Sequence, residues 1–312
     1  MSAAELSPRM VARNLFLWCT DSWANAKYFY RNRLRNAPSR RLFEAHRPQL
    51  NALQQRVADD LTENGIATVR FDELFESPER WDLLCREYES FAKSERVQEA
   101  HHKYRGDAVD NSANKEYLIR KNPPDAAVSL DDPWLQLALD ERILNIVNSY
   151  MGLWTKLHYL DLWYTIPLDL ERSKTASQHW HRDPEDEEII KVFLYFSDVD
   201  EEAGPLQYIP GSRRLRGPYG HLWHKRSEAY PPEKELEEAI PRSRWWTGYG
   251  PAGTLALVDT TGFHRGGYAT KRARLSATWT YVTPATYFAR RFHLDKHYDL
   301  EELSEEARFA LS

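Results

Sequence analysis

The sequence predicts an α+β protein in which a helical N-terminal half packs against a double-stranded β-helix, a cupin-like jelly roll. Two observations lead to this fold class. Apolar residues recur about every 3.6 positions up to about residue 152, and beyond it they recur about every second position. The later strand patterns are short and are separated by turn signals and long loops, which favours a jelly roll over a parallel sheet.

The first half contains three helix patterns. Leucines and a valine at helical spacing predict a helix that ends at Gly65, and a short strand is expected over 66–71. Ser77 and the proline after it are suited to begin a second helix. A third helix is expected to run from Asp132 to about Gly152.

The second half contains strands rich in β-branched and aromatic residues. The expected strands cover 157–166, 189–197, 254–259 and 275–283. We therefore expect a single domain with a mainly helical part over 1–152, a jelly-roll core over about 153–285 and a C-terminal tail over 286–312.

The composition is that of an ordinary globular chain of 312 residues with a formal net charge of -5. Basic and acidic residues are interspersed, so the whole-chain charge does not indicate a nucleic-acid partner. Cys19 and Cys85 form neither a disulfide framework nor a zinc pattern. Without a run of about 18 apolar residues or a secretion signal, we expect no transmembrane segment and a cytoplasmic location. The oligomeric state stays open.

A candidate metal site lies in the segment from Gln178 to Asp183. In an extended chain, residues i and i+2 point to the same side, so His181 and Asp183 can present an imidazole and a carboxylate to one ion. His264, just after the strand over 254–259, is the candidate third ligand. Two histidines and one carboxylate leave one face of the ion open, which suits Fe(II) and oxygen, whereas zinc more often takes other ligand sets. His179 shares the face of His181 and is expected to pack or to support the site, with metal binding as the alternative.

A candidate anion-binding pair follows His264. Arg274 and Ser276 point to the same side of a strand, ten residues and more beyond the histidine. A guanidinium beside a hydroxyl suits the distal carboxylate of a dicarboxylic keto acid.

Together these motifs resemble the phytanoyl-CoA dioxygenase family of 2-oxoglutarate oxygenases over roughly 157–283. The resemblance rests on Gln178-x-x-His181-x-Asp183, on the Gly-Pro-Leu and Pro-Gly-Ser stretch over 204–212, on His264 and on Arg274-x-Ser276. The family usually continues the Pro-Gly-Ser stretch with a histidine, where this chain has Arg213. That departure puts substrate contacts in doubt and leaves the iron set intact.

The resemblance implies Fe(II), 2-oxoglutarate and O2 as metal, cosubstrate and oxidant. His181, Asp183 and His264 would bind the iron, Arg274 with Ser276 the far carboxylate, and Gln178 would lie near the keto-acid end. The implied reaction is hydroxylation, or another oxidation such as desaturation or cyclisation, of an unactivated C–H of a small or lipid-like metabolite, with release of succinate and CO2. Halogenation is disfavoured because the carboxylate ligand is present. The alternatives are a cupin-like metal-dependent hydrolase or isomerase and a binding module without catalysis.

Several charged or aromatic segments remain open. The acidic run over 185–188 is expected to be a solvated loop or a lid. The aromatic and basic N-terminal stretch is expected to pack on the β-domain or on a second subunit, or to lie on a membrane surface. A basic cluster is a candidate site for an anionic substrate group and consists of Arg213, Arg214, Arg216, Lys225 and Arg226. The candidate pocket-lining residues are Arg242, Arg244, Trp245 and Trp246. The histidines at 221, 224, 293 and 297 are expected at the surface.

Overall fold

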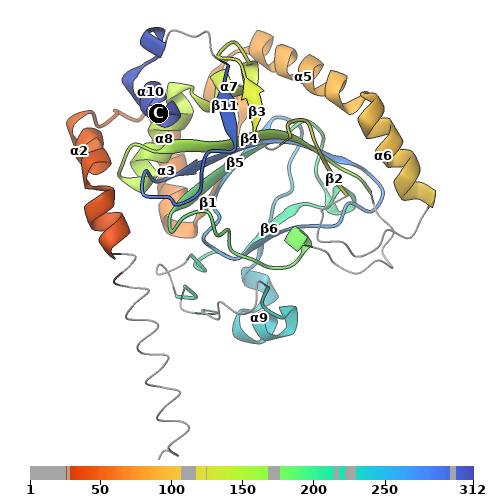
Figure 1. Ribbon diagram of the computed structural model, residues 1–312. Coiled ribbons are helices and arrows are strands. Elements are labelled where there is room, and N and C mark those ends of the chain that lie inside the picture. Colours follow the sequence, from red (N-terminus) through yellow and green to blue (C-terminus); the bar gives the residue numbers. More distant parts are fainter. Residues whose placement is uncertain are drawn as a thin grey trace, which may run out of the picture.

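The computed structural model describes residues 26, 29–106, 117–123, 125–167, 176–213, 218–220, 222, 230–295 and 300–312. Two antiparallel sheets form a jelly roll, which confirms the predicted fold class (Figure 1). The larger sheet has the order β1-β8-β5-β10-β4-β2, and the smaller sheet has the order β7-β6-β9. The strands of the larger sheet are β1 (Ile66–Arg70), β2 (Leu118–Arg120), β4 (Lys156–Thr165), β5 (Ile189–Tyr195), β8 (Thr254–Asp259) and β10 (Arg274–Val282). Those of the smaller sheet are β6 (Leu206–Tyr208), β7 (Trp246–Thr247) and β9 (His264–Gly266).

Helices from the first half and from the C-terminal end pack on one face of the larger sheet (Figure 1). The α-helices are α2 (Ala37–Ala45), α3 (Ala52–Asn64), α4 (Phe71–Phe75), α5 (Pro78–Ala92), α6 (Glu95–Gly106), α7 (Pro133–Ala138), α8 (Glu141–Met151), α9 (Glu233–Ala239) and α10 (Glu305–Leu311). The π-helical turn is η1 (Tyr30–Arg35), and the 3-10 turns are η2 (Ala176–Gln178), η3 (Glu201–Ala203), η4 (Arg242–Arg244) and η5 (Leu300–Glu302). A separate parallel pair consists of β3 (Ala126–Val128) and β11 (Phe292–Leu294).

Local sequence signals explain the helix ends. Gly65 ends α3 in the left-handed region at φ 79°, and Ser77 accepts a hydrogen bond from the backbone N–H of Arg80 at the start of α5. The single helix expected from Asp132 to Gly152 is wrong in one respect. It is two helices, α7 and α8, because the Asp140 side chain accepts the backbone N–H of Arg142 and starts α8 anew.

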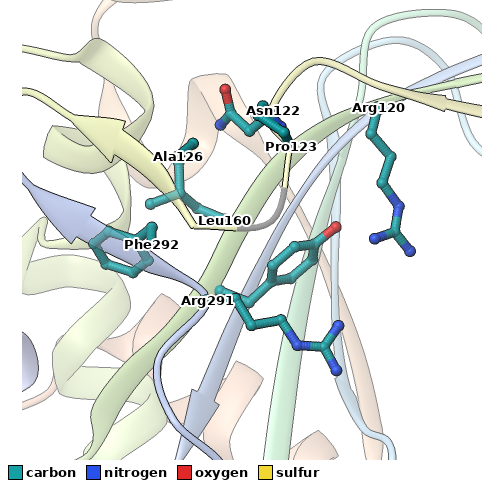
Figure 2. A pocket seen from close by; sticks show the side chains of 8 residues that line it. Arg120, Asn122, Pro123, Ala126, Leu160, Arg291 and Phe292 are labelled. Atoms are coloured by element: carbon teal, nitrogen blue, oxygen red, sulfur yellow. The ribbon is translucent and has the colours of Figure 1, made fainter.

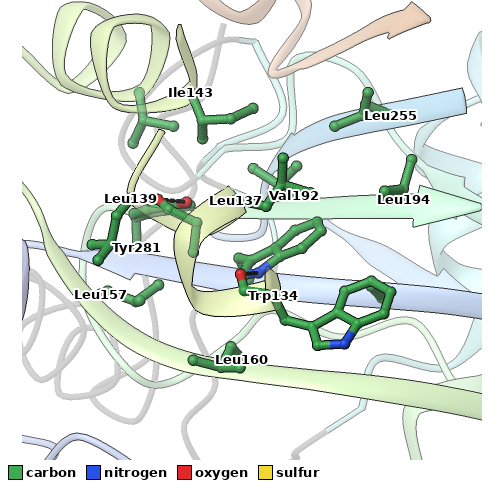
Figure 3. Close-up of a cluster of buried hydrophobic side chains, with 14 of the residues drawn as sticks. Trp134, Leu137, Leu139, Ile143, Leu157, Leu160, Val192, Leu194, Leu255 and Tyr281 are labelled. Carbon is green, nitrogen blue, oxygen red and sulfur yellow. Dashed lines mark hydrogen bonds between the residues drawn. The ribbon is translucent and has the colours of Figure 1, made fainter. Parts of the chain in front are cut away.

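The two faces of β5 show how the larger sheet is buried on both sides. Ile190, Val192 and Leu194 belong to the main apolar core, which lies between the sheet and the helices (Figure 3). The alternate residues Phe193 and Tyr195 belong to a second cluster that also contains residues of β6. Because side chains alternate along a strand, the odd-numbered residues of β5 face the smaller sheet, across what we call the roll interior.

The acidic run over 185–188 is buried except for the partly exposed Glu187, so the expectation of a solvated loop is wrong. Asp186 is 2.8 Å from Arg31 of η1, and Glu188 is 3.4 Å from Arg40 of α2. Arg31 also donates to the carbonyl of Ala285. The described part of the N-terminal stretch thus packs on the β-domain, which is one of the three arrangements that the sequence left open.

Elements outside the expected core limits contribute to the roll. β1 and β2 come from the mainly helical half and occupy the two edges of the larger sheet. The expected C-terminal tail contains β11 and α10, and Ala310 and Leu311 of α10 belong to the main core. Within the described part of the chain, no helix is long and apolar enough to cross a membrane.

Candidate metal centre

The three predicted ligands come together where the segment after η2 meets the start of β9. His181 and His264 are paired through their backbones, each N–H donating to the other's carbonyl at 3.0 Å. The backbone N–H of Asp183 donates to the carbonyl of Thr260, just after β8. His181 and Asp183 therefore lie in an extended segment and not in a regular strand, but this segment is held on two sides.

Both imidazoles are oriented by backbone carbonyls. The Nδ1–H of His181 donates to the carbonyl of His179 at 2.8 Å, and the Nδ1–H of His264 donates to that of Gly262 at 3.0 Å. A carbonyl can only accept, so this contact assigns the ring proton to Nδ1 and leaves on Nε2 a lone pair that can bind a metal. Each ring thus presents the nitrogen that binds a metal.

The ligand atoms surround one small volume. One nitrogen of each histidine and one carboxylate oxygen of Asp183 lie within 4.8 Å of one another. The Nε2 atom of His264 is 3.4 Å from Asp183 Oδ2, and that of His181 is 3.8 Å from Oδ1. His264 and Asp183 are buried while His181 is partly exposed, so the cluster is accessible from the side of His181. This donor set fits a mononuclear iron site with open positions.

Lys191 is a close neighbour of the cluster that sequence reasoning missed. It is an odd-numbered residue of β5, and its Nζ lies 2.7 Å from Asp183 Oδ2 in the roll interior. Burial raises the pKa of the Asp183 carboxyl, but Lys191, His264 and His181 outweigh it and hold this pKa well below its usual range. A lysine within an apolar strand was the signal available in the sequence.

The predicted anion-binding residues, Arg274 and Ser276, lie at the start of β10. Arg274 is buried, and its Nη1 has no hydrogen-bond partner among the described residues. Its Nη2 packs against Gly266, two residues after His264: a methyl group added there would lie 3.5 Å away. Thr165, directly opposite Arg274 on β4, also has a buried Oγ1 without a partner among the described residues. Two such groups side by side fit the polar atoms of a bound ligand.

Ser276 shares the face of Arg274, as predicted. It is buried and lies opposite Trp163 of β4 and Tyr195 of β5. Its backbone N–H donates to the Tyr88 hydroxyl, which in turn donates to the carbonyl of Trp163. The start of β10 is thereby fixed to α5 and β4. Gln178 is buried at the end of η2.

The structure removes Arg213 from the candidate substrate contacts. Its guanidinium is buried against the C-terminal end of α3, donating to the carbonyls of Leu61 at 3.2 Å and Thr62 at 2.7 Å. A cation there satisfies carbonyls that a helix end leaves unpaired. The other four members of the basic cluster lie outside the described residues.

The remaining candidates are distributed as follows. Trp180 is buried in an apolar cluster with Trp245 packed against it, and Trp246 packs against the cluster of the roll interior. Arg242 and Arg244 are exposed, and Arg242 pairs with Glu237. His293 is exposed on β11, as expected, and the other surface histidines at 221, 224 and 297 lie outside the described residues. Tyr230, which sequence reasoning missed, has its ring centroid 6.2 Å from that of His181.

The fold and the cluster define a jelly-roll protein in which two imidazoles and one carboxylate could hold a metal ion. The chain belongs to the phytanoyl-CoA dioxygenase family, whose model matches residues 61–275, more than two thirds of its length. It is therefore an enzyme of the iron- and 2-oxoglutarate-dependent type. No curated protein sequence matches it.

Solved structures share the fold at low identity. EctD from S. alaskensis, crystallised with 2-oxoglutarate and 5-hydroxyectoine, is 18% identical with a TM-score of 0.53, and the match covers 83% of this chain and 86% of that chain. SnoN, a non-heme alpha ketoglutarate dependent epimerase from nogalamycin biosynthesis, is 17% identical with a TM-score of 0.48, over 74% and 83% of the two chains. The likeness to EctD supports the jelly-roll fold.

Proposed function

We propose that this protein is a dioxygenase that uses Fe(II) and 2-oxoglutarate to oxidise an unactivated C–H bond of a small molecule, with release of succinate and CO2. The observation that carries the proposal is the cluster of His181, Asp183 and His264, with both Nε2 atoms directed at the carboxylate. When bound, the metal and the keto acid supply the oxidant. The protein supplies the positions of the reacting groups and a shielded site.

Different residues around the cluster would bind the metal, bind the cosubstrate and exclude water. His181, Asp183 and His264 would hold the iron, and their backbone contacts fix the two rings before the metal arrives. Arg274, with Ser276 and Thr165 beside it, would bind the far carboxylate of 2-oxoglutarate, which explains why a buried guanidinium keeps an unpaired Nη1. Gln178 is proposed to lie near the keto-acid end. Apolar side chains of the roll interior, including Phe193, would exclude water.

The direct test is substrate-free turnover. The metal-free protein reloaded with Fe(II) should convert 2-oxoglutarate to succinate in the presence of ascorbate, and should show a visible absorption band when the keto acid is added without oxygen. The same protein loaded with Zn(II) is the control and should do neither. Absence of both succinate and the band from the iron-loaded protein would exclude the dioxygenase. Tight zinc binding with hydrolase or isomerase activity would then favour the cupin-like alternative.

Replacing Arg274 with methionine is expected to raise the half-saturating 2-oxoglutarate concentration by at least about 30-fold. The reason is that truncating one partner of a buried charge pair costs about 2–5 kcal/mol. Methionine fills a similar apolar volume, so the fold should be retained. Arg272, exposed two residues earlier and paired with Asp200, is the matched control, and Arg272→Met should leave 2-oxoglutarate binding unchanged. Equal half-saturation in the two variants would place the far carboxylate elsewhere.

A further inference from the structure

A pocket lined by two arginines lies beside β4, outside the metal cluster. Its volume is about 210 Å³, and it lies next to the residues that follow β2. Its walls include Arg120, Asn122, Tyr159 and Arg291, with Leu160 and Phe292 on the apolar side. Figure 2 shows the guanidinium groups of Arg120 and Arg291 at the same end of the pocket. Both lie within 6 Å of one ring: their central carbons are 5.9 Å and 5.7 Å from the ring centroid of Tyr159.

Two guanidinium groups line this pocket, and only that of Arg291 lies within ion-pair distance of a carboxylate among the described residues. Arg291 is 3.3 Å from Glu185, but Arg120 forms no ion pair with any described residue. Asp161 is buried and interacts electrostatically with Arg120, and its carboxylate accepts hydrogen bonds from the backbone N–H groups of Asn122 and Leu162 and from the Tyr159 hydroxyl. These donors occupy the carboxylate and leave one guanidinium available for a ligand.

The pocket is linked to the metal cluster by one row of residues across the larger sheet. Tyr159 of β4 lies opposite Thr280 of β10, and Thr280 lies opposite Lys191 of β5, whose ammonium contacts Asp183. Adjacent strands are about 4.8 Å apart, so the backbones of Tyr159 and Lys191 are separated by roughly 10 Å. Between them the Oγ1 atom of Thr280 is buried without a partner among the described residues, and so is that of Thr278, two residues away on β10. The row is therefore a polar surface with unsatisfied groups between the pocket and the metal ligands.

We propose that the pocket between Arg120 and Arg291 binds an anionic group, a carboxylate or a phosphate, of the substrate that the metal centre oxidises. The proposal rests on the proposed function and narrows the substrate to a small molecule that carries an anionic group. Two guanidinium groups beside a tyrosine ring suit bidentate recognition of planar or tetrahedral oxyanions. It also moves the expected anion site from the basic cluster, where Arg213 is buried against α3, to the pocket beside β4.

The test is an anion titration that needs no turnover. Zn(II)-loaded protein saturated with 2-oxoglutarate, so that Arg274 is occupied, is titrated in separate calorimetric arms with inorganic phosphate and with hexanoate. The double variant R120Q/R291Q should bind the preferred anion at least about 10-fold more weakly, a change of about 1.4 kcal/mol. The exposed pair R242Q/R244Q removes the same charge and should bind as the wild type does. R120K/R291K should recover part of the affinity because it restores the charge.

The outcomes separate this inference from the proposed function. R120Q/R291Q should retain substrate-free succinate formation and the half-saturating 2-oxoglutarate concentration of the wild type. Equal anion affinity in the two glutamine variants, or no anion binding by the wild type, would overturn the pocket. A raised half-saturating 2-oxoglutarate concentration in R120Q/R291Q would also overturn it, by assigning these arginines to the cosubstrate. If only the proposed dioxygenase function is wrong, the wild type will form no succinate, but the anion titrations will still distinguish the two glutamine variants.

Discussion

Replacing His181 with alanine is expected to abolish succinate formation from 2-oxoglutarate, whereas replacing His179 with alanine should leave it unchanged. His181 provides an Nε2 at the cluster, while His179 contributes only its backbone carbonyl, which accepts the Nδ1–H of His181 and survives the substitution. Loss of one of three ligands should weaken iron binding by more than about 100-fold, the upper range for loss of a ligand's supporting contact. The measurements are bound iron after gel filtration and succinate by mass spectrometry.

Two results would contradict this assignment. Succinate formation by His181→Ala at the wild-type rate would remove the residue from the cluster, and loss of activity in His179→Ala with normal iron content would give that ring a catalytic part. Both variants should keep the circular dichroism of the wild type, because His181 is partly exposed and neither ring belongs to an apolar core cluster. The pair therefore distinguishes two histidines that share one face in the sequence pattern.

Replacing Lys191 with methionine is expected to destabilise the metal-free protein by about 3–5 kcal/mol, the cost of leaving one partner of a buried ion pair uncompensated. The Lys191 ammonium lies 2.7 Å from Asp183 Oδ2, and the two side chains are only 12% and 9% exposed. Methionine keeps the apolar stem of lysine, so the loss isolates the charge. The measurement is urea unfolding of the chelator-treated protein.

Bound metal should reverse this defect. A divalent cation in the cluster would replace the positive charge that the variant lacks, and removal of the ammonium also removes its repulsion of the ion. Fe(II) or Zn(II) should therefore raise the melting temperature of Lys191→Met more than that of the wild type, through binding to the folded state. Lys191→Arg keeps the charge and should show the wild-type stability without metal. Equal metal-induced shifts in Lys191→Met and the wild type would show that Lys191 does not act through Asp183.

The sequence predicted the helices and strands that depend on residues close together in the chain, such as caps and the spacing of apolar residues. The change to a period of two marked β4, β5, β8 and β10, because each strand places one row of side chains in an apolar cluster. Gly65 and Ser77 marked helix ends through backbone conformations and caps that are local properties. The break before α8 was missed because the apolar stripe continues across Asp140, and only the cap of its side chain interrupts it.

The sequence did not predict the roles of charged residues whose partners lie far away in the chain. Arg213 was expected to meet a substrate, yet it caps a helix about 150 residues earlier in the chain. The acidic run after Asp183 was expected to be solvated, yet Arg31 and Arg40 cover it. The residues next to a charged side chain in the sequence do not show whether it contacts water, a ligand or a side chain from a distant part of the chain.

The metal cluster shows what the sequence could predict and what required the tertiary structure. By itself the sequence predicted the three candidate ligands, since His181, Asp183 and His264 are recognisable from their chemical types, their spacing and their family motifs, and the structure brings them together. Only the tertiary structure decided that both rings are oriented by backbone carbonyls, that Lys191 stands beside Asp183 and that two arginines meet beside β4. Spacing fixes which side chains share a face of one segment, whereas contacts between segments depend on how the strands align across the sheet.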